Sequence, residues 1–262
     1  MPAVTGADRA VEQYYTALAA TYWRRPPYAP RAVDRIVQAS GRRPPVLVAD
    51  VGAGTGHLTF DLLTRGCLVH AVEPNDAMRA VGMARIGPSD SVTWSAGTGE
   101  RTGLTSGHYD LVTYGSSLDD TDRPRAIREA ARILKPDGWL ACAWNRRVLN
   151  DPLQAEVEAL IRSRAPEYGH RRRSRDHARI IGESGFFHPP RRLQERLWHT
   201  VAICDWITAW RSHVPLQRRA GAAFDAIVDE IERLVRDRVS GDELAVPYAT
   251  VGWLAPVRDL AR

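Results

Sequence analysis

Short apolar runs alternate along the chain with stretches in which apolar residues recur every three or four positions. The runs have the length of buried strands and the stretches have the spacing of amphipathic helices, so we expect an α/β fold with a largely parallel sheet. Predicted strands cover residues 46–48, 68–72, 91–95, 109–114, 139–144, 192–201 and 248–255. Predicted helices cover residues 8–23, 32–39, 57–64, 123–134, 153–162, 205–213 and 218–239, and one more ends at Gly182 or Gly185.

The first predicted strand runs into a glycine-rich turn at residues 50–56, Asp-Val-Gly-Ala-Gly-Thr-Gly. Glycine permits positive φ angles and brings bare backbone close to a ligand, which the amides that open the next helix can face. The dinucleotide fingerprint G-x-G-x-x-G would need glycine where the chain has His57, and there is no G-x-x-x-x-G-K-[ST] phosphate loop. Asp50 suits a ligand with ammonium or hydroxyl groups better than a pyrophosphate. We therefore expect a small ligand that is not a dinucleotide.

The second predicted strand ends at Glu73, 21 positions after Gly52. In nucleotide-binding sheets an acidic residue about 20 positions after the glycine turn accepts hydrogen bonds from adjacent ribose hydroxyls. A carboxylate can accept from two hydroxyls at once. The spacing therefore indicates that the ligand contains a nucleoside.

The turn resembles motif I (D-x-G-x-G-x-G) of the class I S-adenosylmethionine (SAM) dependent methyltransferases. Similar family landmarks recur at residues 73–78, 97–100, 109–112 and 134–138, so the resemblance covers residues 10–146. It implies methyl transfer from SAM, with Met78 against the adenine and Thr98 near the adenine amino group. It implies these cofactor-binding residues: Asp50, Gly52, Ala53, Gly54, Gly56, Glu73, Pro74, Met78, Thr98, Gly99, Glu100, Tyr114 and Gly115.

The N-terminal segment is similar to that of one small-molecule branch of this family, the trans-aconitate methyltransferase-like proteins. Tyr22 followed by Arg25-Pro-x-Tyr28 resembles the branch's entry segment, and Trp144-Asn145 resembles its strand ending. The resemblance implies that this segment covers the cofactor and borders the substrate, whereas a plain packing helix is the alternative. The implied substrate residues are Tyr14, Tyr22, Arg25, Ser116, Ser117 and Asn145.

Two side chains are candidates for catalysis, Asp119 and His57. Asp119 follows the fourth strand, where a doubly wound sheet places its ligand. The alternative role for an acid in this stretch is structural: Asp120 or Asp122 would be the N-cap of the next helix. His57 opens the helix after the glycine turn and either acts as a base or faces solvent. Methyl transfer depends mainly on positioning, so no obligatory catalytic residue is expected.

The chain is predicted to form one domain over residues 1–262. Its parts are a helical N-terminal cap (1–44), a SAM-binding core (45–146), a cap insertion (147–185) and the remaining sheet with inserted helices (186–262). A last antiparallel strand inserted beside the sixth would give a Rossmann-like seven-stranded sheet of order 3-2-1-4-5-7-6, as the resemblance implies.

Composition and charge limit the kinds of ligand and macromolecule that the chain is expected to bind. The 262 residues carry a formal charge of +5, but of 36 basic residues only Lys135 is lysine, which indicates codon bias more than nucleic-acid binding. The run His170–Arg175 either binds an anion or RNA phosphates or is a solvated loop. We expect no metal, three buried reduced cysteines, no membrane span and a cytoplasmic protein, monomeric or homodimeric. The predicted acceptor is a small molecule, methylated on O, N or C, with secondary metabolism as one setting. Alternatives are an RNA- or protein-modifying methyltransferase, a SAM-binding protein without methyl transfer, and a dehydrogenase, against which His57 argues.

Overall fold

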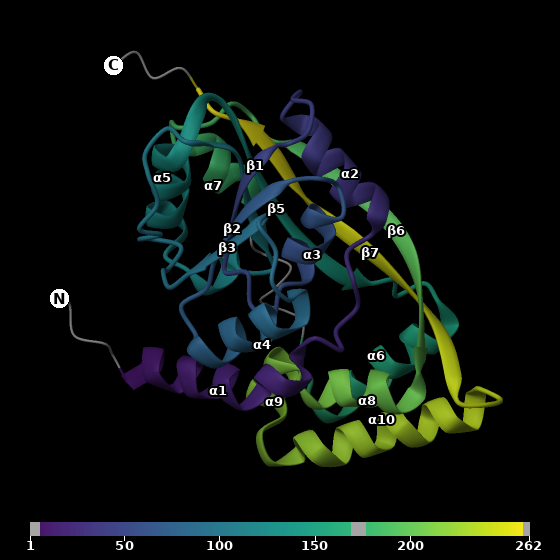
Figure 1. Ribbon diagram of the computed structural model, residues 1–262. Helices are drawn as coiled ribbons and strands as arrows, with labels where there is room; N and C mark the ends of the chain where they lie inside the picture. Colours follow the sequence, from purple (N-terminus) through teal and green to yellow (C-terminus); the bar gives the residue numbers. More distant parts are fainter. Residues whose placement is uncertain (1–5, 169–176, 259–262) are drawn as a thin grey trace.

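The computed structural model describes residues 6–168 and 177–258, and it contains one seven-stranded sheet (Figure 1). The strand order is β3-β2-β1-β4-β5-β7-β6, which confirms the predicted topology. The strands are β1 Leu47–Val51, β2 Leu68–Val72, β3 Val92–Ser95, β4 Tyr109–Gly115, β5 Leu134–Arg147, β6 Arg191–Ala202 and β7 Glu243–Pro256.

Strands β1 to β5 run parallel, and β7 pairs antiparallel with both β5 and β6. The register sets Val51 beside Val72 and Asp50 beside Thr113, so β1, β2 and β4 end close together at one edge of the sheet. Ligands of doubly wound sheets bind at this carboxyl edge, where strand order reverses around β1.

Helices cover both faces of the sheet (Figure 1). One face is covered by α5 (Arg123–Ile133) and α7 (His177–Glu183), and the core on this side includes Val112 of β4. The other face is covered by α2 (Pro30–Ala39) and α3 (His57–Leu63), and the core on that side includes Leu111 of β4. Successive residues of a strand point to opposite faces, so the uninterrupted apolar sequence of β4 follows from burial on both sides.

A second apolar core lies beyond the carboxyl edge, in the lower part of Figure 1. Helices α6 (Pro152–Arg164), α8 (Ile203–Arg211) and α10 (Phe224–Arg238) contribute Ile161, Trp206 and Ile231 to it. Helix α9 (Val214–Ala220) joins α8 to α10, and α1 (Gly6–Tyr22) crosses below α4 (Asp76–Ile86). These helices form a cap beside the edge at which a ligand is expected.

The structure differs from the predictions in three secondary-structure elements and at one cysteine. Helix α4 was not predicted, since its buried side includes few large apolar residues, and its N-cap is Asn75, which accepts the Met78 N–H at 3.0 Å. The single helix predicted over 218–239 is broken at Gly221, whose φ is +53°. Strand β5 begins at Leu134 and not at Trp139, because Leu134 already pairs with Tyr109 of β4. Residues 135–138 form an irregularity before the regular pairing resumes at Trp139. Cys204 is exposed, so only two of the three cysteines are buried as predicted.

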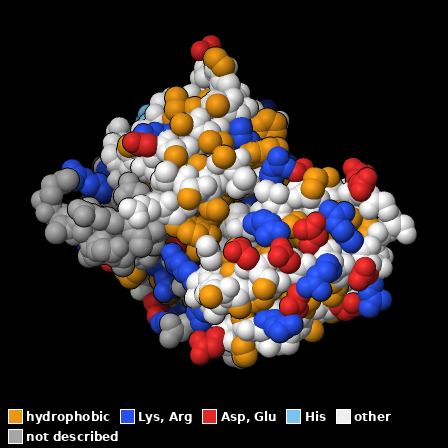
Figure 2. Space-filling view, turned by 90° about the horizontal axis from the view of Figure 1, so that it is seen from below, with side chains coloured by type: hydrophobic (Ala, Val, Ile, Leu, Met, Phe, Trp, Pro, Cys, Tyr) orange, Lys and Arg blue, Asp and Glu red, His pale blue; other side chains and the backbone are white. Residues whose placement is uncertain are grey.

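Charged side chains of both signs mix on the face seen from below (Figure 2). On α10 and its neighbours they form ion pairs such as Arg211–Asp229 and Arg164–Glu230. Arginines therefore alternate with acidic side chains over the described part of this face. The run at 170–175 lies outside the described residues. No helix in the described segments has the length and apolarity needed to cross a membrane.

Candidate functional site

The glycine turn is held against the second strand by backbone hydrogen bonds. Gly52 has a φ of +69° and donates its N–H to the Val72 carbonyl at 2.8 Å. Gly54 and Gly56 also have positive φ angles, of +58° and +80°. This backbone favours glycine, and it places the turn directly beside the end of β2, where Glu73 follows.

Glu73 closes the turn with its carboxylate. Its Oε2 accepts the Gly54 N–H at 2.8 Å and its Oε1 accepts the Asn75 N–H at 2.9 Å. Burial raises the pKa of Glu73, although these two N–H groups act to lower it. Each oxygen has a second lone pair, so two hydroxyl donors can still be accepted. The geometry therefore fits a ribose diol at this carboxylate.

Asp50 lies under the turn and contacts side chains of the core. It is 1% exposed, and its two oxygens accept hydrogen bonds from Thr59 at 2.6 Å and Thr113 at 2.7 Å. Burial raises the pKa of Asp50 to about 6, against the opposing effect of the threonine hydroxyls. Asp50 was predicted to bind the cofactor, whereas both of its carboxylate oxygens bond to threonines of α3 and β4.

Met78 packs against the turn from α4. Its Cε lies 3.4 Å from where a Cβ on Gly54 would be, and its side chain is 3% exposed. Pro74 is exposed beside it. Met78 therefore provides an apolar surface next to Glu73, as a bound purine base would require.

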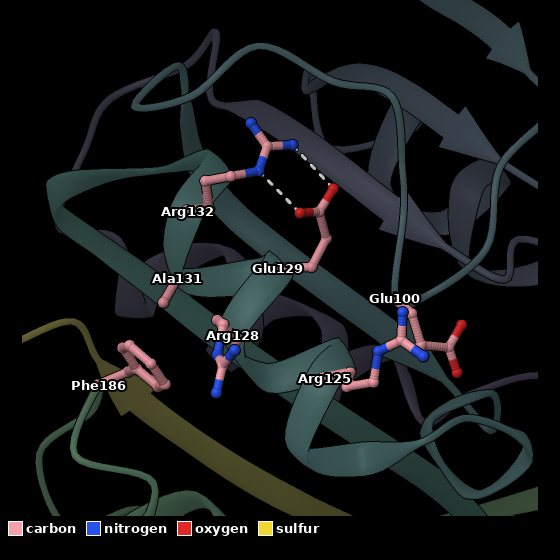
Figure 3. Close-up of a pocket in the computed structure, with 7 residues that line it drawn as sticks. All are labelled: Glu100, Arg125, Arg128, Glu129, Ala131, Arg132 and Phe186. Atoms are coloured by element: carbon pink, nitrogen blue, oxygen red, sulfur yellow. Dashed lines mark hydrogen bonds and ion pairs between the residues drawn. The ribbon is translucent and has the colours of Figure 1, made fainter.

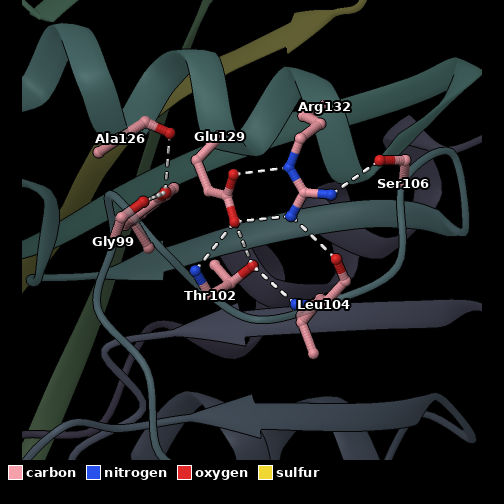
Figure 4. A network of polar contacts seen from close by, with 8 residues as sticks. Gly99, Thr102, Leu104, Ser106, Ala126, Glu129 and Arg132 are labelled. Atoms are coloured by element: carbon pink, nitrogen blue, oxygen red, sulfur yellow. Dashed lines mark hydrogen bonds and ion pairs between the residues drawn. The ribbon is translucent and has the colours of Figure 1, made fainter.

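The turn after β3 is fixed by a polar network (Figure 4). Glu129 on α5 accepts the backbone N–H of Thr102 at 2.9 Å and its hydroxyl at 2.6 Å, and it pairs with Arg132. Burial alone would raise the pKa of Glu129, but the bonds from Arg132 and Thr102 outweigh it and lower the pKa to about 2. The network anchors the segment that contains the predicted adenine turn.

Within that turn, Thr98 is exposed and exchanges two backbone hydrogen bonds with Arg101. The Glu100 carboxylate accepts the Asp122 N–H at 2.6 Å. Glu100 also borders a hollow on α5 whose lining mixes acids and bases (Figure 3). This hollow includes no residue of the glycine turn, of Glu73 or of the loop after β4. The Glu100 carboxylate therefore points toward the start of α5, where it bonds to Asp122.

The loop after β4 reaches back to the glycine turn. Ser116 has a φ of +62°, which is uncommon for a residue other than glycine, and its hydroxyl lies 3.1 Å from that of Tyr28. Backbone strain of this kind is common at functional sites. Gly115 lies beneath Tyr28. The Tyr114 side chain is fully buried and bonds to backbone carbonyls of Gly99 and Ala126, so only its backbone can face a ligand.

Asn145 holds the N-terminal segment in place. Its amide nitrogen donates to the carbonyl oxygens of Pro26 and Pro27, each at 2.8 Å, and its oxygen accepts the Thr250 hydroxyl at 2.6 Å. Thr250 in turn accepts the Ala29 N–H at 2.7 Å. Asn145 was predicted to contact substrate, whereas here both ends of its amide position the segment that precedes Tyr28.

His57 anchors the same segment at its other end. Its Nε2 bonds to the Trp23 carbonyl at 2.8 Å and its Nδ1 lies 3.3 Å from the Thr55 hydroxyl. Burial, together with the charge of Arg85, lowers the pKa of His57 to about 4. Both ring nitrogens therefore have partners, which favours a structural role over the predicted alternatives of a base or a solvent-facing side chain.

Four buried polar groups, on α1, on the segment after it and on β5, have no hydrogen-bond partner among the described residues. They are Tyr14 Oη, Arg25 Nε, Trp144 Nε1 and Arg147 Nη1. Arg25 donates through Nη2 to the Ser212 carbonyl at 2.5 Å, and the Arg147 guanidinium lies 4.9 Å from the Trp210 ring centre. Both arginines thus meet the end of α8. Each unpartnered group is a hydrogen-bond donor.

Tyr14 and Tyr22 flank this region from α1. Burial raises the pKa of Tyr14 to about 12, and the Arg25 guanidinium stacks 4.4 Å from the Tyr22 ring centre. The structure therefore brings Tyr22 and Arg25, two of the predicted substrate residues, together. Arg147 was missed, since a single arginine after a strand has no distinctive pattern in an arginine-rich chain.

The three acids after β4 have separate partners. Asp122 is the N-cap of α5 and accepts the Arg125 N–H at 3.3 Å, as predicted for one of the acids here. Asp120 accepts the Tyr15 hydroxyl at 2.8 Å. Asp119 lies 2.8 Å from Nε2 of His177, a residue to which no sequence pattern points. No cluster of metal-ligating side chains occurs in the segments that the structure describes.

The comparisons with known proteins bear on this arrangement. A solved structure from Anaeromyxobacter dehalogenans, described as a type II methyltransferase, superimposes with a TM-score of 0.55 and 22% identity, over 89% of this chain and 97% of the other. The fold is that of the class I methyltransferases. Residues 49–142 match the family model described as a methyltransferase domain.

Curated relatives match the chain over about half of its length or less. An uncharacterized methyltransferase of Mycobacterium tuberculosis is 39% identical over 123 residues, 47% of this chain and 48% of the relative. The ubiquinone/menaquinone biosynthesis C-methyltransferase of Methylobacterium nodulans is 35% identical over 107 residues, 38% of this chain and 42% of that protein. The chain thus spans about half the length of the curated relatives it matches. The family match over residues 49–142 includes the glycine turn and Glu73.

Proposed function

We propose that this protein transfers the methyl group of SAM to a small-molecule acceptor. The observation that carries the proposal is the Glu73 carboxylate, which bonds to Gly54 of the glycine turn and retains acceptor positions for two hydroxyls. The match of residues 49–142 to a methyltransferase domain supports it independently. SAM supplies a methyl group already activated on a sulfonium, so the protein's main contribution is to position the two reactants.

In this proposal Glu73 binds the ribose hydroxyls of SAM and Met78 lies against its adenine. The turn of Gly52, Gly54 and Gly56 faces the methionine end, since glycine allows the closest approach of backbone. Thr98 and Gly99 border the adenine edge, while Gly115 and the backbone of Tyr114 border the methyl group. Asp50 supports the turn from below through Thr59 and Thr113.

The acceptor side of the proposal rests on the four unpartnered buried groups of Tyr14, Arg25, Trp144 and Arg147. A buried donor without a partner costs about 1–3 kcal/mol, so a ligand with several oxygens would be favoured there. Aromatic side chains around these donors would contact an apolar body. One relative is named for a step in the biosynthesis of quinones, which are small molecules, and this supports an acceptor of similar size.

The proposal is tested by following labelled methyl from SAM into a panel of phenols, alcohols, amines and carboxylic acids, with bulk tRNA and a protein mixture as separate arms. Transfer to a compound of the panel that requires Glu73 supports the proposal. Transfer to tRNA or protein alone would contradict the small-molecule part. Tight SAM binding with no transfer in any arm would favour the alternative of a SAM-binding protein.

A further inference from the structure

Asp119 and His177 come together from segments 58 positions apart. Asp119 belongs to a short 3-10 helix, η1 (Leu118–Asp120), that directly follows the loop after β4, and His177 is the first residue of α7. His177 Nε2 lies 2.8 Å from Asp119 Oδ1. The two side chains are 5% and 12% exposed, so the contact is largely shielded from water.

The His177 ring is also held by stacking. Its centre lies 4.2 Å from that of Trp144 with a tilt of 33° between the planes. An ionised carboxylate can only accept, so its bond to Nε2 requires the proton there and leaves a lone pair on Nδ1 of the neutral ring. Nδ1 has no hydrogen-bond partner among the described residues. The arrangement is that of a base oriented by an acid.

The pair lies at the edge where the acceptor is expected. Asp119 is two residues from Ser117, which contacts Gly52 and donates to the Val51 carbonyl at 2.6 Å. Trp144, under the His177 ring, has a buried indole N–H without a partner and belongs to the proposed acceptor region. The imidazole therefore contacts both the short helix after the β4 loop, through Asp119, and the Trp144 indole on β5.

We propose that His177 removes a proton from the acceptor and that Asp119 is its positioning residue. This inference rests on the proposed methyltransferase function. As the acceptor's X–H proton moves to Nδ1, the freed electron pair forms the new bond to the methyl carbon, and the methyl–sulfur bond breaks with its pair left on sulfur. Asp119 stabilises the resulting imidazolium. The acceptor class is therefore a hydroxyl, phenol or other nucleophile that carries a proton, and an ionised carboxylic acid is excluded.

The tautomer of His177 provides a test that needs no acceptor. In ¹⁵N NMR spectra of the full chain with S-adenosylhomocysteine bound, Nε2 is expected to carry the proton and Nδ1 to be bare. The Asp119→Asn variant is expected to change this distribution. A proton on Nδ1 in the neutral ring of the unaltered protein would overturn the inference.

The second test is kinetic and uses the panel compound that is methylated fastest. His177→Ala is expected to lower kcat by about 10²- to 10⁴-fold, with partial rescue by added imidazole, while binding of S-adenosylhomocysteine is unchanged. His188→Ala, at an exposed histidine, is the matched control. If His177→Ala does not fold, His177→Asn takes its place.

The outcomes separate the two proposals. Normal kcat in the His177 variants, or a panel in which only carboxylic acids are methylated, would overturn the role of His177 and leave the methyltransferase proposal intact. Failure of the unaltered protein to bind S-adenosylhomocysteine would overturn the methyltransferase proposal itself.

Discussion

The Ser117 hydroxyl donates a hydrogen bond of 2.6 Å to the carbonyl oxygen of Val51, so the loop after β4 is tied to the strand that enters the glycine turn. The same side chain fills the space beside Gly52, where an added Cβ would overlap the Ser117 Cβ. The two sides of the proposed site, the donor turn and the loop that borders the acceptor, are therefore in direct contact.

Gly52→Ala is expected to destabilise the protein and weaken cofactor binding, because φ is +69° and the new methyl group meets Ser117. The left-handed conformation alone costs alanine about 1–2 kcal/mol. Gly103→Ala is the control, since Gly103 also has a positive φ but nothing within 4 Å of the added Cβ. Chemical denaturation should show a larger loss for Gly52→Ala, partly relieved by Ser117→Gly. Equal losses for the two alanine variants would contradict the steric argument.

Asp50 predicts an unusual dependence of stability on pH. Its pKa is raised from 3.8 to about 6, so the folded protein holds this proton more tightly than the unfolded chain, and the contribution of Asp50 to stability falls as the pH rises through that interval. The asparagine of the Asp50→Asn variant does not ionise, so this pH dependence is absent from the variant. Relative to the unaltered protein, the variant should gain up to about 3 kcal/mol of unfolding free energy between about pH 4 and 7.

Urea denaturation at several pH values measures this difference, with Asp90→Asn in an exposed turn as the control. A difference between Asp50→Asn and the unaltered protein that stays constant with pH would show that Asp50 is not held in a raised-pKa environment.

The lowered pKa of Glu129 leads to the opposite expectation, a loss of stability as the pH falls. Its pKa is lowered to about 2 by Arg132 and Thr102, so its contribution is complete above the unfolded value near 4.5 and is lost as the pH falls toward 2. Glu129→Gln should lower the free energy of unfolding at pH 7 by about 2 kcal/mol, the scale of a charge-assisted hydrogen bond. Glu183→Gln removes an exposed pair with Arg179 and should cost less than about 0.5 kcal/mol. Similar melting temperatures for the two variants would refute a special role for the network.

The fold could be predicted because its signals are local. Each buried strand of the parallel part is a short apolar run, and burial on both faces explains the uninterrupted sequence of β4. The signals that failed were weak ones. Helix α4 buries Met78 and Gly82, which give little helical pattern, and Gly221 breaks a stretch whose apolar spacing continues on both sides.

The donor side of the site was predictable for a similar reason. Gly54 and Glu73 follow the ends of adjacent parallel strands and are 19 positions apart, so local spacing brings them together. His177 meets Asp119 only through the packing of α7 on the sheet, which no local pattern encodes. For Asn145 the sequence motif was recognised and a substrate contact was predicted from it. Its amide nitrogen instead donates to the carbonyl oxygens of Pro26 and Pro27.

The central claim is that Glu73 and the glycine turn bind the nucleoside of SAM. Calorimetry with S-adenosylhomocysteine should show binding in the micromolar range for the unaltered protein. Glu73→Gln should weaken it by about 10²-fold, because two charge-assisted hydrogen bonds to the ribose become weaker. Glu243→Gln, at an exposed glutamate that opens β7, should bind as the unaltered protein does. Absence of binding to the unaltered protein, or equal affinity in Glu73→Gln, would contradict the account.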